Sequence, residues 1–188
     1  CVEKIASLPN LTAVLGNHDV AVLGKMPLVA FNGDARISLE WQIATLKQEN
    51  ADFLSELPQK PIIMEDVTLV HGSPRDPVWE YILNTLSARL NFDHFTTAWC
   101  LVGHSHLQCM FQLNTDTDRV SLAPIRSGEH FILRPRAILN PGSVGQPRHS
   151  DPRAAYPIYD TNAHARAPRR VAHNIPEVQK RIREAGLP

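Results

Sequence analysis

Three short motifs in this chain carry residue types that bind metal ions. They are Gly-Asn-His-Asp at residues 16–19, His-Gly at 71–72 and Gly-His-Ser-His at 103–106. An amide oxygen and neutral imidazoles are ligands that suit divalent Mn, Fe, Zn, Ni or Co. The candidate ligands are Asn17, His71, His104 and His106. Each motif follows a short apolar run, so we expect all three at strand ends, where the reactive groups of α/β sheets collect.

The Gly-His-Ser-His motif is informative because of its setting. Two histidines that stand two residues apart face the same way when the local backbone is extended. Alone, such a pair is more often a surface or structural feature than a metal site. Here it directly follows the apolar run 99–102, and His71 stands at the end of a second strand-like run. The combination favours a metal site.

Gly-Asn-His-Asp is the most specific of the three motifs. Gly16 permits a tight turn, and Asn17 offers a neutral oxygen to a hard cation. His18 is a candidate acid, and Asp19 can hold its imidazole in one tautomer and raise its pKa. The alternative is a plain polar turn, because such residues favour turn positions.

His71 alone would carry little weight, because a histidine at a strand end is more often a polar cap than a ligand. The residues that follow, Ser-Pro-Arg-Asp-Pro at 73–77, predict a rigid loop. The planar guanidinium of Arg75 can pair with two oxygens of a phosphate. An ion pair of Arg75 with Asp76 or Glu80 is an equally good interpretation.

Composition and charge exclude several classes of protein. The chain is 43% hydrophobic and 20% charged, as in ordinary globular proteins. No apolar run approaches the roughly 20 residues that cross a bilayer, so we expect no membrane partner. Nineteen Lys and Arg balance nineteen Asp and Glu. Proteins that bind nucleic acids usually carry a compact basic face, so the charge argues against a nucleic-acid partner.

Three cysteines, at positions 1, 100 and 109, fit no zinc-finger spacing. We interpret them as small hydrophobic residues in a reducing compartment. This interpretation predicts a cytoplasmic location.

Apolar periodicity and turn residues predict an ordered series of elements. We expect helices at residues 1–8, within 38–56, at 79–90 and at 177–185. We expect strands at 11–15, 67–70, 98–102, 109–113, 131–133 and 137–139, and a hairpin that pairs 156–159 with 170–173. Residues 140–148 are rich in turn formers and predict a loop. Apolar strands between helices indicate a sheet covered by helices.

The three motifs, in this order, resemble those of the calcineurin-like metallophosphoesterases, and most closely the compact bacterial phosphodiesterase-like branch. The resemblance covers nearly the whole chain. It implies a four-layer α/β/β/α sandwich of two mixed sheets flanked by helices. It also implies two divalent metal ions and a phosphate-ester substrate, with a hydroxide held between the metals attacking phosphorus.

The resemblance also assigns roles to single residues. Asn17 and the three motif histidines would be metal ligands. His18 would protonate the leaving group, and Asp19 would orient His18. Residues 140–148 resemble the Asn-Pro-Gly-Ser segment of bacterial members, so Arg148 would lie near the substrate. A purely structural turn is at least as good an interpretation of this segment. The other histidines, at 94, 130, 149, 164 and 173, match no motif and are interpreted as surface or core residues.

Members of this family carry two earlier motifs, Asp-x-His and Gly-Asp, whose carboxylates bridge the metals. Neither motif occurs upstream of Gly16. Asp19 and Asp76 stand in other predicted roles and are poor substitutes. We therefore expect residues 1–188 to be the larger part of one domain that lacks its first β-α-β segment, about 50–70 residues. We expect the chain as written to have weak activity or none. The rival explanation is a natural, inactive short form.

Two other functions fit the same residues. One is a non-catalytic binding or scaffold protein that has kept the fold. The other is a nuclease of the same superfamily, which would bind DNA in a salt-sensitive manner. The sequence leaves the physiological substrate, the metal and the oligomeric state open.

Overall fold

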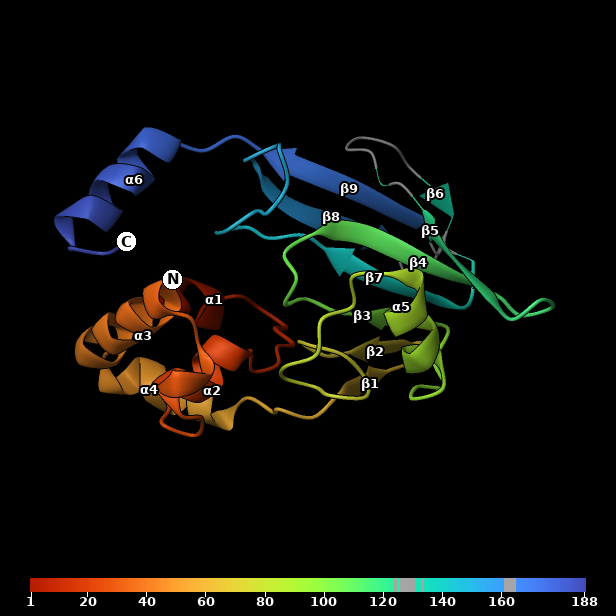
Figure 1. The fold of residues 1–188 in the computed structure, drawn as a ribbon, viewed down its shortest axis with the longest axis horizontal. Helices are drawn as coiled ribbons and strands as arrows, with labels where there is room; N and C mark the ends of the chain where they lie inside the picture. Colours follow the sequence, from red (N-terminus) through yellow and green to blue (C-terminus); the bar gives the residue numbers. More distant parts are fainter. Residues whose placement is uncertain (124, 126–130, 133, 161–164) are drawn as a thin grey trace. The chain divides into compact units, whose positions relative to one another are not determined.

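The computed structural model describes residues 1–123, 125, 131–132, 134–160 and 165–188. The chain forms two compact units, and each is described by itself (Figure 1). One unit contains residues 1–59 together with 174–188, and the other contains residues 60–173. Among the described residues, no helix is both long and apolar enough to cross a membrane.

The first unit is helical in its described residues. Its elements are α1 (Val2–Ala6), α2 (Asn17–Val22), the 3-10 helix η1 (Leu28–Ala30), α3 (Gly33–Thr45), α4 (Gln48–Glu56) and α6 (Ile175–Glu184). Polar caps fix two of these helices: Asn32 accepts from the Ala35 N–H at the start of α3, and Asn174 accepts from the Glu177 N–H at the start of α6. The helices expected within residues 1–8, 38–56 and 177–185 are confirmed.

The strand expected at residues 11–15 is not formed. The described backbone there is irregular, although Leu15 is fully buried. The N–H of Leu15 donates to the carbonyl of Pro58 at 2.9 Å. A strand requires a ladder of such bonds with a neighbour, and this apolar segment pairs with no described strand.

The second unit contains a six-stranded mixed sheet. Its order is β1 (Ile62–Met64), β2 (Val67–Leu69), β3 (Trp99–Leu101), β7 (Ala137–Pro141), β4 (Gln108–Asn114) and β5 (Arg119–Ala123). Strands β2, β3 and β7 are adjacent and parallel to one another. Strands β1, β4 and β5 pair with their neighbours in the antiparallel sense. The sequence predicted β2, β3, β4 and β7 but missed β1 and β5.

A three-stranded sheet lies in the same unit, in the order β6 (Phe131–Ile132), β9 (Ala165–Val171) and β8 (Ala154–Asp160). The expected α/β architecture with two sheets is confirmed. A late hairpin is formed as well, but residues 156–159 pair with 166–169 and not with the predicted 170–173. The smaller sheet is antiparallel in its described strands, so the expectation that both sheets are mixed is wrong. Only four residues separate β8 from β9, and a parallel pairing needs a crossover of a dozen or more.

Alternation along the central strands divides the apolar core between the two faces of the large sheet. Trp99, Ala137 and Leu139 belong to one cluster, while Cys100 and Ile138 belong to the other. This is the period of two that a pleated strand imposes when both of its faces are covered.

Each face of the large sheet is covered by a different element. Helix α5 (Thr85–Phe92) packs on one face, with Phe92 in the buried cluster. On the other face, Tyr159 of β8 packs against Trp99, with ring centroids 5.8 Å apart. Residues 79–84, which were predicted to begin α5, form a loop, because the side chain of Asn84 caps the helix by accepting from the Ser87 N–H.

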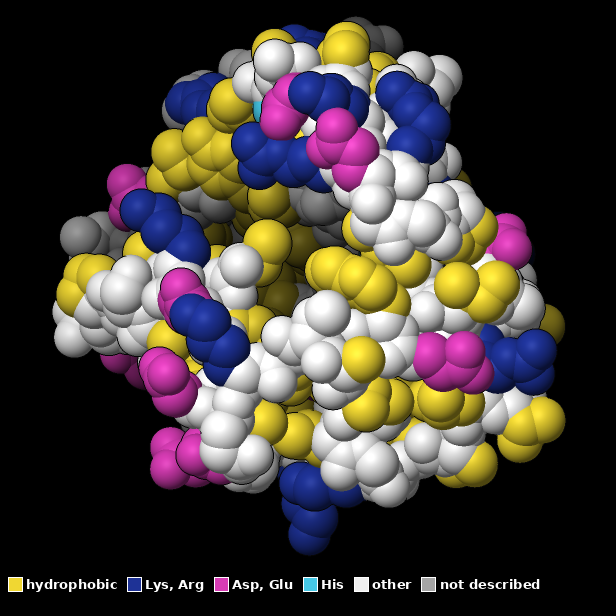
Figure 2. Space-filling model, turned by 90° about the vertical axis from the view of Figure 1, so that its left-hand side faces the viewer, with side chains coloured by type: hydrophobic (Ala, Val, Ile, Leu, Met, Phe, Trp, Pro, Cys, Tyr) yellow, Lys and Arg dark blue, Asp and Glu magenta, His cyan; other side chains and the backbone are white. Residues whose placement is uncertain are grey.

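Basic and acidic side chains are interspersed on the face of the molecule drawn in Figure 2. Ion pairs also form elsewhere on the surface. On α5, Arg89 pairs with both Asp93 and Asp118.

Candidate metal centre

His71 and His104 lie together at one edge of the six-stranded sheet. Because β2 and β3 are parallel neighbours, with Thr68 opposite Cys100, the residues that follow both strands emerge at the same edge. Nε2 of His71 lies 3.3 Å from Nδ1 of His104. The N–H of Gly103 donates to the carbonyl of His71 at 2.7 Å. The structure thus brings together two of the predicted site residues.

Backbone carbonyls fix the tautomers of two motif histidines. Nε2 of His104 lies 3.0 Å from the carbonyl oxygen of Trp79, and Nδ1 of His106 lies 2.7 Å from that of Gln146. A carbonyl oxygen only accepts, so both of these nitrogens carry the proton and donate. Nδ1 of His104 therefore accepts the hydrogen bond from Nε2 of His71 at 3.3 Å, and Nε2 of His106 carries a lone pair. Histidines that bind metals usually donate their other N–H in this way.

The backbone of the Gly-His-Ser-His motif is not extended at its two histidines. His104 and His106 have φ of 58° and 60°, in the left-handed region that residues other than glycine rarely adopt. Each such residue costs roughly 1–3 kcal/mol and persists only where the surroundings fix it. The condition under which both histidines would face the same way is therefore not met, and other contacts must hold the motif.

Asn140 supplies those contacts. Its buried side-chain Nδ2 donates to the carbonyl of Gly103 and, at 3.0 Å, to Oγ of Ser105. Its Oδ1 accepts from the N–H of Gly142 at 2.9 Å. Sequence reasoning placed Asn140 in a loop near the substrate but gave it no role. The only signal was its place at the start of the Asn-Pro-Gly-Ser segment.

The predicted loop at 140–148 begins later than expected, because residues 140 and 141 belong to β7, and the loop that follows folds back on the same motif. It provides the Gln146 carbonyl to His106, and the next residue, His149, accepts from the Gln108 N–H at 2.6 Å. Burial lowers the pKa of His106, and the charge of Arg148 lowers it further, although the bond to Gln146 raises it. Arg148 is therefore close enough to His106 for the two charges to interact.

The Gly-Asn-His-Asp motif lies in the helical unit, in the first turn of α2. Asn17 is buried, while His18 is exposed and contacts Phe31 edge-on, with ring centroids 5.1 Å apart. Oδ2 of Asp19 accepts from the Gly16 N–H at 2.8 Å. Burial raises the pKa of Asp19, opposed by that hydrogen bond and by His18. The proposed orientation of His18 by Asp19 stays a prediction.

The spacing of the His71 and His104 nitrogens fits two ligands of one cation. Nitrogen ligands about 2.0–2.1 Å from a metal ion, at tetrahedral or octahedral angles, lie roughly 2.8–3.4 Å apart. The observed separation is 3.3 Å. No group of three or more His, Cys, Asp and Glu side chains gathers among the described residues. The pair is thus at most part of a ligand set, and the inclusion of Asn17 and His106 stays a prediction.

A sequence model of the calcineurin-like phosphoesterase superfamily domain matches residues 1–164. The chain belongs to this superfamily. The matched residues span both units and include all three motifs. The expected family is therefore confirmed, and its members typically use divalent metal ions.

The chain is also similar to other proteins and to solved structures. An uncharacterized protein of Methanocaldococcus jannaschii is 32% identical over 194 residues, which cover all of this chain and 75% of that protein. The crystal structure of a metallophosphoesterase from Sphaerobacter thermophilus matches with a TM-score of 0.87 and 41% identity, over all of this chain and 77% of that one. A hypothetical protein of Pyrococcus horikoshii matches with a TM-score of 0.74 at 17% identity, over all of this chain and 73% of that one, and shows the fold alone.

In this calcineurin-like chain, Arg75 forms an ion pair with Glu80, which is one of the two interpretations that the sequence allowed. Its guanidinium pairs with Glu80, through Nε at 3.3 Å and also through Nη2. The same carboxylate accepts from Oγ of Ser73 at 2.5 Å and from Nδ2 of Asn91 at 2.9 Å. Burial raises the pKa of Glu80, but the bonds from Arg75, Ser73 and Asn91 more than offset it and bring the pKa to about 2. A phosphate role for Arg75 stays a prediction.

The histidines without a motif divide into three groups. His94 and His173 are exposed, as expected. His149 accepts a hydrogen bond from the backbone N–H of Gln108 in β4, the strand that follows the Gly-His-Ser-His motif. No sequence pattern predicted this contact. His130 and His164 lie outside the described residues.

Proposed function

We propose that this protein hydrolyses phosphate esters, as a phosphatase or phosphodiesterase, with a dinuclear centre of divalent metal ions. The observation that carries the proposal is the 3.3 Å separation between Nε2 of His71 and Nδ1 of His104. The hydrogen bond from Nε2 of His104 to the Trp79 carbonyl places the lone pair of this imidazole on Nδ1. Asn17, His71, His104 and His106 are the proposed ligands. Metal ions bound there would stabilise charge on the phosphoryl oxygens and supply a water nucleophile active at neutral pH.

The remaining roles belong to the chain's own side chains. His18 is exposed to solvent, and it would protonate the departing alkoxide. Asp19 would hold the charged form of His18. Arg148 carries a positive charge near His106 and would pair with a phosphoryl oxygen. A cytoplasmic location is proposed as well, because none of the three cysteines forms a disulfide among the described residues.

The test compares esters whose leaving groups differ in how much they depend on protonation by a general acid. The protein is purified without metal, loaded with Mn²⁺ and assayed with p-nitrophenyl phosphate, bis-p-nitrophenyl phosphate and phenyl phosphate. We expect hydrolysis that depends on metal. His18→Ala should lower kcat about 100-fold or more for phenyl phosphate, whose leaving group is basic, and less for the nitrophenyl esters.

His94→Ala is the matched control, because His94 is an exposed histidine of the other unit, and it should keep wild-type rates. The proposal is overturned if the metal-loaded protein hydrolyses none of these esters, or if the His18 and His94 variants behave alike.

A further inference from the structure

The loop between β2 and α5 places two aromatic rings beside His104. The ring of Tyr81 stacks on the imidazole of His104 with centroids 3.8 Å apart and an angle of 16° between planes. The ring of Trp79 lies 5.9 Å from the same imidazole. Yet Tyr81 is 41% exposed and Trp79 is 37% exposed. A candidate metal ligand is thus bordered by aromatic surface that is open to solvent.

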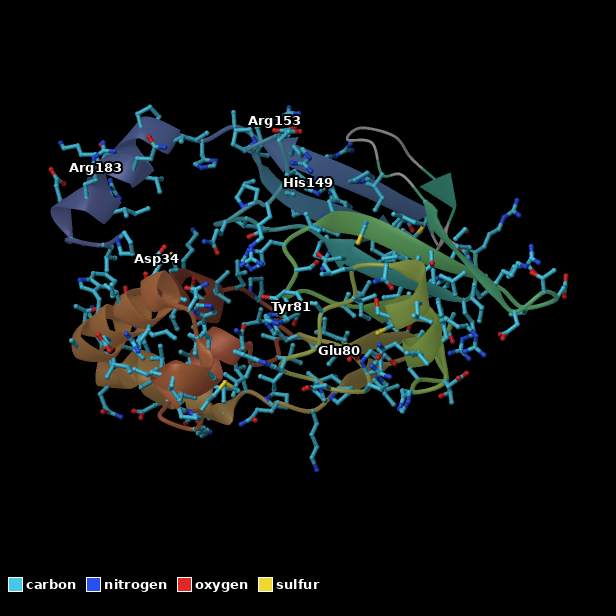
Figure 3. All side chains as sticks on the ribbon, viewed as in Figure 1. Asp34, Glu80, Tyr81, His149, Arg153 and Arg183 are labelled. Carbon is cyan, nitrogen blue, oxygen red and sulfur yellow. The ribbon has the colours of Figure 1, made fainter. Side chains whose placement is uncertain are left out.

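The loop that carries these rings is rigid because Glu80 lies between them. Its carboxylate accepts hydrogen bonds from Ser73, Arg75 and Asn91. Figure 3 labels Glu80 and the neighbouring Tyr81. Three polar side chains, two in this loop and one in the last turn of α5, are therefore linked by a single ionised side chain. Such a network fixes the backbone on both sides of Glu80, and hence the place of each ring.

Gly72 tightens the same loop. Its N–H donates to the carbonyl of Pro77 at 2.7 Å, and a Cβ at this position would lie 2.7 Å from the carbonyl oxygen of Asp76. Real side chains do not approach so closely, so only glycine permits the loop to fold over itself here. The His-Gly motif therefore positions the aromatic rings as well as His71.

We propose that Tyr81 and Trp79 form a stacking platform that selects phosphate esters whose alcohol carries a planar aromatic ring, such as a nucleobase. This inference rests on the proposed phosphoesterase function. Tyr81 contacts His104 directly, so an ester held by a cation at His104 would have these exposed rings within reach of its organic group. Stacking on aromatic side chains accepts any base, because every base presents a flat face.

A ring that is fixed before the ligand binds gives higher affinity than a mobile one. A mobile side chain loses conformational entropy when it stacks on a ligand, and a fixed side chain loses little. The Glu80 network and the His104 contact hold Tyr81 before any ligand arrives. The loss of one stacking partner typically lowers affinity by roughly tenfold or somewhat more.

The first experiment measures binding without catalysis. Adenosine, which has the ring but no phosphate, is titrated into the metal-free protein, and its dissociation constant is measured by saturation-transfer NMR. Ribose 5-phosphate is titrated in parallel. We expect adenosine to bind, and Tyr81→Leu to raise its dissociation constant about tenfold. Tyr81→Phe keeps the ring and should restore affinity to within about twofold.

Tyr156→Leu is the matched control, because Tyr156 is 39% exposed but lies on β8, in the other sheet. It should bind adenosine as the wild type does. Unchanged melting temperatures of the three variants would show that each is folded.

The second experiment separates selection from support of the metal ligand. With Mn²⁺ bound, kcat/KM is measured for 1-naphthyl phosphate and for the alkyl ester glycerol 2-phosphate. A platform predicts that Tyr81→Leu lowers the naphthyl-to-glycerol ratio about tenfold, mainly through KM. Equal losses for both esters, together with unchanged adenosine binding, would overturn the platform and leave the proposed function intact. Hydrolysis of neither ester by the wild type would overturn the proposed function instead.

Discussion

The two regions that carry the candidate site residues are built in different ways. The histidines of the second unit stand at the ends of buried strands, and their rings are held by backbone atoms 25 and 40 residues away in the chain. Gly-Asn-His-Asp stands in the first turn of the six-residue helix α2, where Asp19 binds the backbone of Gly16, three residues away. One region is fixed by the tertiary structure and the other by local sequence.

This difference has a physical consequence. The histidine region concentrates strain, since two residues adopt left-handed φ, and that strain is balanced by distant hydrogen bonds. Changes in those contacts should therefore alter geometry at a site far away in sequence. A change in the first turn of α2 should alter little beyond that turn. The predictions below test this contrast, from the largest expected effect to the smallest.

The largest effect is expected from His104→Ala. It removes a proposed ligand together with the partner of the Trp79 carbonyl and of the Tyr81 ring. We expect kcat/KM for bis-p-nitrophenyl phosphate to fall on the order of a thousandfold, because metal ions supply several kcal/mol of charge stabilisation. Isothermal titration with Mn²⁺ should show weaker binding as well. Wild-type metal affinity in this variant would remove His104 from the ligand set.

Asn140→Ala should change the geometry of the Gly-His-Ser-His motif, although the two segments are far apart in the sequence. It deletes three hydrogen bonds, to Gly103, Ser105 and Gly142, each worth roughly 1 kcal/mol. We expect the free energy of unfolding in urea to fall by about 3 kcal/mol. We also expect a 10- to 100-fold loss of activity, which is typical when a group that orients a metal-binding side chain is removed.

The matched control for this change is Asn114→Ala. Asn114 is exposed and accepts from Asp116 and Thr117 in the turn between β4 and β5. Its loss should cost about 1 kcal/mol at most and leave activity unchanged. Equal effects of the two variants on activity would mean that Asn140 does not hold the motif.

The sequence revealed the location of the histidines but not what holds them. Apolar runs that end in polar residues showed β2 and β3, and parallel pairing then required His71 and His104 to meet. The role of Asn140 was hidden, because its contacts lie 35 and 37 residues away and an asparagine in a turn is common. The left-handed backbone at His104 depends on those contacts, so no local pattern could predict it.

Strand prediction failed for related reasons. The run at 11–15 is apolar enough for a strand, but strands are defined by pairing, which one segment alone does not reveal. The edge strands β1 and β5 are short, and β5 (Arg119–Ala123) is largely exposed, so its hydrophobic signal is weak. The ion pair of Arg75 with Glu80 was foreseeable from spacing, whereas the contribution of Asn91 depends on how α5 packs.

Glu80 offers a smaller effect that depends on pH. Its pKa is about 2 in the folded protein, below the ordinary value of 4.5, so its ionised form stabilises the fold above pH 4.5. That stabilisation is lost as pH falls from about 4.5 to 2, and its size is about 2 kcal/mol after allowance for partial exposure. Glu80→Gln should flatten urea-unfolding stability across this window.

Glu40→Gln is the control for pH. Glu40 forms an exposed pair with Arg36 at 4.0 Å, and such pairs contribute less than about 1 kcal/mol. Its variant should keep the wild-type acid dependence. A Glu80→Gln protein whose stability still falls like the wild type between pH 4.5 and 2 would show that other carboxylates cause the fall.

The smallest structural effect is expected from Asp19→Asn. The amide oxygen of asparagine can still accept from the Gly16 N–H, so the first turn of α2 keeps its hydrogen bond and loses only a charge. Because such interactions fade within one helical turn, we expect stability to change by about 0.5 kcal/mol or less. The ¹⁵N shifts that report the tautomers of His104 and His106 should not move. If they did move, local change in one region would reach the other, and the contrast between the two regions would fail. Activity should nevertheless fall, because the charge proposed to support His18 is gone, so this variant separates a catalytic role from a structural one.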